Sequence, residues 1–351
     1  MGNLLITGGA GFIGANFVRH WRSAAPDQGI VVLDALTYSG NRASLAGVDG
    51  VELIVGNICD TALVQRLLIE RRIDRIVHFA AESHVDRSIT GPDAFVTTNV
   101  VGTHSLLKAA RAAWLYTGSG RPHRFHHIST DEVYGSLGPE DPAFRETTAY
   151  APNSPYAASK AASDHLVRSY HHTYGLETTT SNCSNNYGPY QFPEKLIPLF
   201  ILNALSGRAL PIYGDGLNVR DWLHVDDHCR GIELILTQGR SGETYNIGGG
   251  QELTNLEVVE AICSGIDAAF DADPALARRF PDAPAVQGRP TATLKTFVED
   301  RKGHDRRYAI DEGKIRSTLG YAPSRDFNRG FAETLHWYLA NESWWRPLLA
   351  R

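Results

Sequence analysis

Two short segments of this 351-residue chain combine side chains that can exchange protons. In the first, Tyr156 and Lys160 are four residues apart, so both lie on one face if the segment is helical. Tyrosine is a weak base at neutral pH, but a nearby ammonium group stabilises the phenolate. Such a pair is often only part of a helix face. Its place in the chain, behind a glycine-rich turn described below, favours a catalytic role.

The second segment is Thr130-Asp131-Glu132, which follows an apolar run at residues 124–129. Adjacent carboxyl groups can act as separate acid and base when their surroundings move their pKa values apart. The same pattern also suits a helix start, with a capping threonine and an acidic first turn. Because parallel sheets place ligands at the carboxyl ends of their strands, the position after a predicted strand favours the catalytic interpretation.

A glycine-rich turn near the start of the chain is typical of a phosphate-binding backbone. Gly8, Gly11 and Gly14 follow the first apolar run and open the first helical pattern. Glycines at this spacing let the backbone approach a pyrophosphate, whose charge is met by the helix N-terminus. Asp34 ends the second apolar run, where a carboxylate accepts ribose hydroxyls and repels a 2′-phosphate. The segment predicts a dinucleotide site that prefers NAD to NADP.

The elements that must position these groups alternate between short apolar runs and longer amphipathic segments. Strands are predicted at residues 3–6, 30–33, 51–55, 75–79 and 124–129, and helices at 12–23, 61–72, 93–113 and 156–174. This alternation predicts an α/β fold with a Rossmann-type, doubly wound parallel sheet. We place an NAD-binding domain at residues 1–184 and a smaller, loop-rich substrate lobe mainly at 185–351, with some segments returning to the first domain. A helix is expected at 331–345, and a helix and loop at 268–293.

Composition limits the expected partners. Hydrophobic residues make up 42% of the chain and charged residues 21%, which is typical of a globular protein. The formal net charge of −5 provides no basic surface for nucleic acid. No apolar run reaches membrane-spanning length, and the N-terminal residues lack the pattern of a secretion signal. Four scattered cysteines without a CxxC pair fit reduced thiols, so we expect a cytoplasmic protein.

One cluster has the composition of a metal site. His224, Asp226, Asp227 and His228 lie within five residues of one another. We expect no metal, because no further ligand cluster supports the site, and we interpret Asp226 as the cap of the helix that follows.

With these motifs in place, the sequence resembles the dTDP-glucose 4,6-dehydratases of the extended short-chain dehydrogenase/reductase superfamily. The resemblance covers nearly the whole chain, through residues 8–14, 34–38, 78–86, 129–135, 156–160, 185–196, 220–227 and 303–308. Adjacent Asp131 and Glu132 are its most specific part, because epimerases and decarboxylases of the superfamily typically lack them. Asn57 and Lys302 depart from the family, which usually has Asp and Pro there. Asn57 can still accept a hydrogen bond through its amide oxygen.

The resemblance implies a reaction in three stages. Tyr156, supported by Lys160, takes the proton of the sugar C4 hydroxyl while hydride passes to NAD, and Thr130 holds the same oxygen. Glu132 then removes the C5 proton, Asp131 protonates the departing C6 hydroxyl, and hydride returns to C6. The product is the 4-keto-6-deoxy sugar nucleotide.

The resemblance also implies the binding residues. Cofactor contacts are expected from Gly8, Gly11, Phe12, Ile13, Gly14, Asp34, Leu36, Thr37, Asn57, Ile58, Ala80, Ala81, Ser83, Asn99, Tyr156 and Lys160. Substrate contacts are expected from Ser83, Thr130, Asn185, Glu194, Lys195, Leu196, Pro211, Tyr213, Arg220, Asn255, Arg301, His304 and Tyr308. A homodimer is implied as well, formed by pairing the helices at 93–113 and 156–174 into a four-helix interface.

Three alternatives stay open. A nucleotide-sugar 4-epimerase would use the Tyr–Lys pair and NAD without an acid–base pair at residues 131 and 132. A 4,6-dehydratase could act on UDP-glucose instead of dTDP-glucose. A non-catalytic sensor on the same fold would bind without turnover, because a fold alone does not fix function. The pathway that uses the product, surface polysaccharide or secondary metabolite, is also open.

Overall fold

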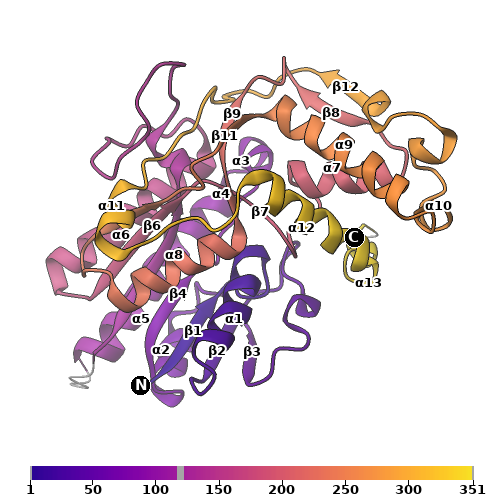
Figure 1. The fold of residues 1–351 in the computed structure, drawn as a ribbon. Helices are drawn as coiled ribbons and strands as arrows, with labels where there is room; N and C mark the ends of the chain where they lie inside the picture. The colour runs from indigo at the N-terminus through magenta and orange to yellow at the C-terminus, as the bar shows by residue number, and fades with distance from the viewer. Residues whose placement is uncertain (1, 117–121, 350–351) are drawn as a thin grey trace.

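The computed structural model describes residues 2–116 and 122–349, and its main feature is a seven-stranded parallel sheet (Figure 1). The strands lie in the order β3-β2-β1-β4-β5-β6-β10. Their bounds are β1 Asn3–Thr7, β2 Ile30–Asp34, β3 Val51–Val55, β4 Ile73–His78, β5 Arg124–Thr130, β6 Thr178–Cys183 and β10 Thr244–Ile247. The order reverses between β1 and β4, as in doubly wound sheets, so the predicted fold class is confirmed.

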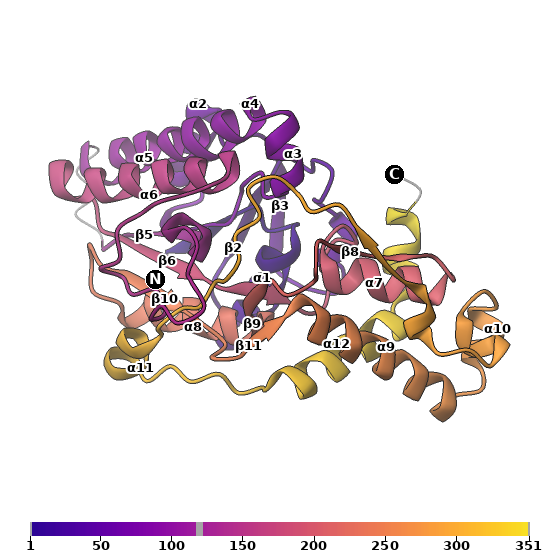
Figure 2. The same ribbon diagram turned by 90° about the horizontal axis from the view of Figure 1, so that it is seen from above.

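Helices cover both faces of this sheet (Figure 2). On one face lie α1 (Phe12–Ala24) and α8 (Val225–Gln238), and on the other α2 (Thr61–Glu70), α5 (Thr103–Arg111) and α6 (Pro155–Tyr174). Successive residues of a strand point to opposite faces. Leu4 of β1 therefore joins the core under α1 and α8, whereas Leu5 joins the core under α2 and α5. Burial on both faces explains why the strands are apolar runs without alternation.

The predicted helix 93–113 is a longer helical run with two irregular turns. It consists of α4 (Asp93–Phe95), the π-helical segment η2 (Val96–Gly102), α5, and a second π-helical segment η3 (Ala112–Tyr116). The first irregular turn faces α6, where Asn99 Nδ2 donates to Ser159 Oγ at 2.8 Å and Ser163 Oγ donates to Asn99 O at 2.7 Å. These bonds fix α6 against its neighbour.

A smaller lobe lies beyond the carboxyl ends of the strands (Figures 1 and 2). Its strands form a three-stranded sheet, β11-β9-β7, and a parallel pair, β12-β8. Their bounds are β7 Asn185–Tyr187, β8 Leu210–Tyr213, β9 Val219–His224, β11 Glu252–Thr254 and β12 Lys295–Val298. Its main helices are α7 (Leu196–Leu205), α9 (Asn255–Ala272) and α12 (Phe327–Ala340), which share one apolar core. The lobe is therefore richer in helix than predicted.

The shorter elements complete the chain. They are α3 (Val85–Thr90), α10 (Leu276–Arg279), α11 (Gly313–Leu319), α13 (Glu342–Trp345), η1 (Arg42–Leu45), η4 (Asp131–Tyr134), η5 (Pro284–Gln287), η6 (Thr291–Leu294) and η7 (Arg346–Leu348). The single helix expected at 331–345 is wrong in its bounds, because α12 begins four residues earlier and the chain breaks at Asn341 before α13. Segments after residue 184 also return to the first sheet, where β10 forms its edge and α8 packs beside α1.

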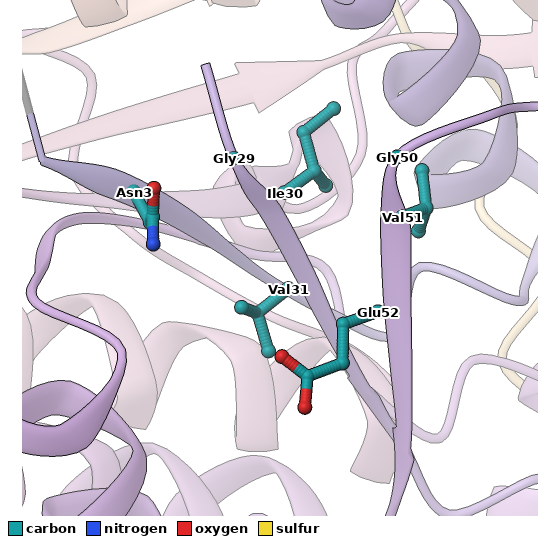
Figure 3. A pocket seen from close by; sticks show the side chains of 7 residues that line it. All are labelled: Asn3, Gly29, Ile30, Val31, Gly50, Val51 and Glu52. Carbon is teal, nitrogen blue, oxygen red and sulfur yellow. The ribbon is translucent and has the colours of Figure 1, made fainter.

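A shallow hollow of about 370 Å³ lies at the amino ends of β1, β2 and β3 (Figure 3). Asn3, Val31 and Glu52 are among its lining residues. It lies at the edge of the sheet opposite the strand ends that carry Thr7 and Asp34, and it contains none of the predicted site residues. No helix in the described part of the chain is long and apolar enough to cross a membrane.

Candidate active site

A cavity of about 510 Å³ at the carboxyl ends of the strands collects nearly all the predicted site residues. Its lining includes the predicted cofactor residues Gly8, Gly11, Phe12, Ile13, Gly14, Asp34, Thr37, Asn57, Ile58, Ala80, Ala81, Ser83, Tyr156 and Lys160. It also includes Thr130, Asp131, Glu132, Asn185, Glu194, Lys195, Leu196, Pro211, Tyr213, Arg220, Asn255, Arg301 and His304. Leu36, Asn99 and Tyr308 are predicted contacts that lie outside the lining.

The glycine-rich turn brings backbone close to backbone at the start of α1. A methyl group on Gly14 would lie 2.3 Å from the carbonyl oxygen of Gly8, and one on Gly8 would lie 2.6 Å from the amide nitrogen of Ala80. Gly8 also has a φ of +69°, which disfavours other residues. No side chain caps α1 at Gly11, so its first amide groups are open to the cavity. This arrangement fits the pyrophosphate of a dinucleotide.

Asp34 at the end of β2 is held by its own backbone surroundings. Its carboxylate accepts hydrogen bonds from Ala10 N at 2.9 Å and from Leu36 N at 2.8 Å. Burial raises the pKa of Asp34, and these two bonds lower it. Leu36 thus orients the carboxylate from outside the cavity. Asn57 lines the cavity, and its Oδ1 accepts from Cys59 N at 2.8 Å.

Thr130 ends β5 and also begins the short helix η4. Its Oγ1 accepts a hydrogen bond from Glu132 N at 3.4 Å and donates to Asp131 Oδ1 at 3.3 Å. Asp131 and Glu132 form the acidic first turn that follows. The interpretation as a helix start is therefore confirmed, and the capping threonine and the two carboxyl groups also line the cavity.

The two adjacent carboxyl groups have different surroundings. Asp131 is only 1% exposed, and its Oδ2 has no hydrogen-bond partner in the described structure. Burial, then Glu132 and Asp221, raise the pKa of Asp131 well above its usual range. Burial also raises the pKa of Glu132, but the positive charges of Lys195, Arg301 and Arg220 lower it. The environment therefore favours a protonated Asp131 beside a more acidic Glu132.

Tyr156 and Lys160 lie on the first turns of α6. The helix begins at Pro155 and is capped by Ser154, whose Oγ accepts from Ala157 N at 3.1 Å. Burial and then the charge of Glu132 raise the pKa of the Tyr156 phenol, whereas a hydrogen bond with the Thr130 side chain lowers it. Lys160 Nζ donates to the backbone oxygen of Ile128 at 2.7 Å, which places the ammonium group against β5.

Arg220 brings a buried positive charge to the lobe side of the cavity. It is 4% exposed and donates to backbone oxygens, including that of Asp305 at 2.9 Å. Its guanidinium lies 4.2 Å from the ring centre of Tyr308, whose hydroxyl donates to Asp305 Oδ2 at 2.5 Å. Tyr308 therefore supports Arg220 from behind the cavity wall.

A second cluster of polar and charged side chains surrounds Glu194. Tyr38 Oη donates to Glu194 Oε1 at 3.0 Å, and Arg87 Nη2 lies 3.3 Å from Oε2. Arg87 also lies 3.8 Å from the ring centre of Tyr38. Sequence reasoning did not single out these partners or the lining residues Glu82 and His84. Tyr38 lies in the segment 34–38 and the others lie in or next to the segment 78–86, and these two segments of the resemblance were the available signal.

The cluster at residues 224–228 differs from its prediction. His224 caps α8, its Nδ1 accepting from Asp226 N at 3.3 Å, so the interpretation of Asp226 as the cap is wrong. Asp226 instead pairs with Arg325 at 3.0 Å. His228 Nδ1 lies 2.9 Å from Asn186 Oδ1. Among residues 2–116 and 122–349, no group of three or more His, Cys, Asp or Glu side chains could hold a metal ion.

Comparison with known proteins gives the family. The model of the GDP-mannose 4,6 dehydratase family matches residues 5–334. A dTDP-glucose 4,6-dehydratase of Xanthomonas campestris pv. campestris (strain B100) is 54% identical, covering 99% of this chain and 96% of that protein. The dTDP-glucose 4,6-dehydratase 1 of Escherichia coli (strain K12) is 51% identical, covering 97% and 94%. The chain belongs to the family of the dTDP-glucose 4,6-dehydratases.

Solved structures of this dehydratase family and of its neighbours share the fold. DesIV, the dTDP-glucose 4,6-dehydratase from Streptomyces venezuelae with NAD and TYD bound, has a TM-score of 0.87 and 50% identity, covering 99% of both chains. A UDP-glucose 4-epimerase from Thermotoga maritima with UDP-glucose has a TM-score of 0.82 and 26% identity, covering 97% of this chain and 99% of the epimerase. Dehydratases and epimerases therefore differ in their sites rather than in their folds.

Proposed function

We propose that the protein converts dTDP-glucose to dTDP-4-keto-6-deoxy-glucose with NAD as a bound cofactor. The observation that carries the proposal is that Asp131, Glu132 and Tyr156 face one cavity beside the glycine-rich turn. A 4-epimerase needs the tyrosine and the cofactor but has no use for an additional acid and base. The relatives that are 54% and 51% identical over nearly their full length are dTDP-glucose 4,6-dehydratases, which supports the choice of substrate.

The residues at the start of α1 fit NAD. The open amide groups of the helix suit the pyrophosphate, and Asp34 suits the ribose hydroxyls. DesIV, which is 50% identical, contains NAD. When bound, NAD accepts hydride from the sugar C4 and returns it to C6, so that it ends the cycle unchanged.

Tyr156 begins the reaction by taking the proton of the C4 hydroxyl, and Thr130 holds the same oxygen through its hydroxyl. Burial opposes a charged phenolate, so Tyr156 needs a nearby cation to act as the base. Lys160, one turn along α6, is that cation. A ketone at C4 then acidifies the neighbouring C5 hydrogen, which otherwise is far too weakly acidic to be removed.

Glu132 removes the C5 proton and Asp131 protonates the departing C6 hydroxyl. These roles follow from the surroundings of the two groups. Burial raises the pKa of both groups, but Lys195, Arg301 and Arg220 oppose that rise at Glu132, which suits a base, whereas Glu132 and Asp221 add to it at Asp131, which suits an acid. The C5 carbon is reprotonated after hydride returns to C6.

The lobe binds the nucleotide diphosphate. Arg220 and Arg301 present guanidinium groups to the cavity, and their forked geometry suits phosphate oxygens. Arg220 has backbone oxygens rather than a carboxylate as its hydrogen-bond partners, so its charge is available to an anion. Asn255, Tyr213 and Pro211 line the same side of the cavity, where the base and ribose would lie.

A homodimer is part of the proposal. Exposed apolar side chains lie on the helical run 93–116 and on α6, with Val96 52%, Val101 50% and Tyr174 40% exposed. Pairing these helices with their copies would bury them in a four-helix interface. We also propose a cytoplasmic location, supported by free thiols at Cys59, Cys183, Cys229 and Cys263.

The deciding experiment follows the mass of the product. Purified protein is incubated with dTDP-glucose and, in parallel, with UDP-glucose. Loss of one water from dTDP-glucose alone is the expected result. Loss of water from UDP-glucose alone would keep the reaction and overturn the nucleotide. The galactose isomer without a change in mass would mean an epimerase, and tight binding without turnover would mean a sensor.

A further inference from the structure

A buried carboxylate lies beneath the predicted catalytic pair. Asp164 follows Lys160 by four residues on α6, and both side chains are only 5% exposed. Residues at this spacing are neighbours on one face of a helix. Burying an ammonium or a carboxylate is unfavourable unless each has a partner. The proposed mechanism uses Lys160 and gives Asp164 no role.

Asp164 and Lys160 are both bound to the strand β5. Asp164 Oδ2 accepts from Ser129 Oγ at 2.8 Å and from Tyr150 Oη at 2.9 Å. Lys160 Nζ donates to the backbone oxygen of Ile128 at 2.7 Å. Because residues 128 and 129 are consecutive, the two charges are held at adjacent positions of one strand. That strand continues directly into Thr130.

Other ionisable groups face this pair from every neighbouring strand. His78 on β4 and His127 on β5 are fully buried, and burial holds the pKa of each well below its usual value, so both are neutral. Asp164 Oδ1 lies 3.1 Å from His127 Nε2. Cys183 on β6 is also buried, and its raised pKa keeps the thiol neutral.

The remaining neighbours of Asp164 are aromatic or lie on α6. Tyr134 and Tyr150 have pKa values raised by burial and are neutral phenols, and His165 is adjacent in sequence. Among the groups that raise the pKa of Lys160, Asp164 is thus the one that carries a charge at neutral pH.

We propose that Asp164 is a positioning residue that keeps Lys160 protonated and thereby keeps Tyr156 able to act as the base. The expected effect on catalysis rests on the proposed function, but the expected effect of Asp164 on the protonation of Lys160 does not. Burial lowers the pKa of Lys160 to about 8, and Asp164 opposes that effect. Without the carboxylate, the ammonium would lose its proton within the working range of pH.

Asp164→Asn separates this role from a purely structural one. Asparagine has the same shape, and its carbonyl oxygen can still accept from Ser129 and Tyr150. Only the charge is removed. Asp227→Asn is the matched control, because Asp227 is 1% exposed and accepts from Ser324 N at 3.0 Å and Arg325 N at 3.2 Å, away from the cavity.

The first measurement is an NMR titration of the lysine side chains. The chain has only the lysines Lys108, Lys160, Lys195, Lys295, Lys302 and Lys314, so ¹³C-lysine labelling gives few signals. A Lys160→Arg variant assigns the signal of Lys160. A nearby opposite charge shifts a pKa by about 1–3 units, and Asp164 raises the pKa of Lys160, so the Lys160 midpoint should fall by at least about one unit in Asp164→Asn. An unchanged midpoint in the folded variant would overturn the proposal.

The second measurement is the pH profile of kcat/KM. Loss of charge on Lys160 raises the pKa of Tyr156, so the acidic limb should move to higher pH in Asp164→Asn and stay in place in Asp227→Asn. An equal movement in both variants would show a structural effect and overturn the proposal. Absence of turnover in the unaltered protein would instead refute the proposed function, and the NMR titration would still test Asp164.

Tyr150→Phe provides a second variant should Asp164→Asn not fold. Removing this donor takes away a bond that lowers the pKa of Asp164, which burial raises to about 6. Asp164 then loses its charge at a higher pH, and the acidic limb should move upward by less than in Asp164→Asn. A limb that does not move in a folded Tyr150→Phe variant would contradict the proposal.

Discussion

The separate roles of Asp131 and Glu132 can be tested by following the C5 hydrogen in heavy water. The two conservative variants are Asp131→Asn and Glu132→Gln. Both replace an ionisable carboxyl group by a neutral amide while keeping the size of the side chain. If Glu132 is the base, its loss stops exchange at C5 and all later steps. If Asp131 is the acid, its loss leaves exchange at C5 and slows only the departure of water.

The structure sets the size of these effects. Asp131 is buried, and burial raises its pKa well above the usual range, which favours the neutral acid, so an amide replaces one neutral group by another, and its oxygen can still accept from Thr130. Fold and substrate binding should therefore change little. Removing a general acid or base slows a step by about 10²–10⁴-fold, which is about 3–5 kcal/mol of transition-state stabilisation. This loss should fall on kcat.

Glu132→Gln has an additional effect on binding. The carboxylate of Glu132 faces the positive charges of Lys195, Arg301 and Arg220. Removing it leaves more uncompensated positive charge beside the diphosphate site, so the variant should bind dTDP-glucose at least as tightly as the unaltered protein. A lower kcat with an unchanged or lower KM distinguishes a lost catalytic group from a damaged site.

The assay uses dTDP-glucose in deuterium oxide, with mass spectrometry for loss of water and NMR for deuterium at C5 of the recovered substrate. Asp131→Asn should accumulate substrate that carries deuterium at C5, and Glu132→Gln should not. Deuterium at C5 in Glu132→Gln, or full formation of product, would refute the assignment of the base. Interchanged results would reverse the two roles.

Three further predictions test the cofactor turn, the dimer and the support of Arg220. Gly14→Ala would place a methyl group 2.3 Å from a backbone oxygen, so the purified variant should lack bound NAD. Gly175→Ala is the control, because its added methyl group would meet no atom within 4 Å, although Gly175 has a φ of +71°. This variant should retain NAD and lose about 1–2 kcal/mol of unfolding free energy. Val101→Glu should give a monomer in analytical ultracentrifugation. Tyr308→Ala should raise KM through loss of packing against Arg220, whereas Tyr308→Phe should leave KM within about threefold, since a ring remains.

Apolar patterning predicted the central strands closely but missed β6. The five predicted strands differ from the observed ones by at most two residues at either end. The strand β6, Thr178–Cys183, is fully buried yet consists mainly of Thr, Ser and Asn. Two of its polar side chains have partners from elsewhere in the fold, since Thr179 Oγ1 and Ser181 Oγ lie 2.9 Å and 3.1 Å from the two ring nitrogens of His126. Such partners are invisible to a search for apolar runs.

Helix ends were harder to predict than helix existence. His224 rather than Asp226 caps α8, although aspartate is the more common cap. The break at Asn341 has no proline or glycine to announce it, and it coincides with packing of Trp344 and Trp345 against the core of the lobe. Both outcomes depend on tertiary contacts that local preferences do not contain.

The motifs located the candidate site, but they did not distinguish residues that line the cavity from residues that hold the lining residues in place. Leu36, Asn99 and Tyr308 lie within or close to segments that line the cavity, but they lie outside the lining, and each contacts a neighbouring residue. Leu36 holds the carboxylate of Asp34, and Asn99 Oδ1 accepts from Glu82 N at 2.9 Å. Sequence spacing gives the position of a residue along the chain, whereas its side-chain direction is set by packing. Asp164 was missed for the same reason, although its spacing from Lys160 was visible.

Thr130 shows why a structural and a chemical interpretation need not compete. A cap requires a side-chain acceptor directed at the first amide groups of the helix, and here the hydroxyl of Thr130 supplies it where an extended strand turns into a helix. In a parallel sheet that point is also where ligands bind. The hydroxyl of Thr130 therefore meets the amide of Glu132, the carboxyl of Asp131 and the phenol of Tyr156 from one position. The turn that caps η4 also brings Asp131 and Glu132 into the cavity that Tyr156 lines.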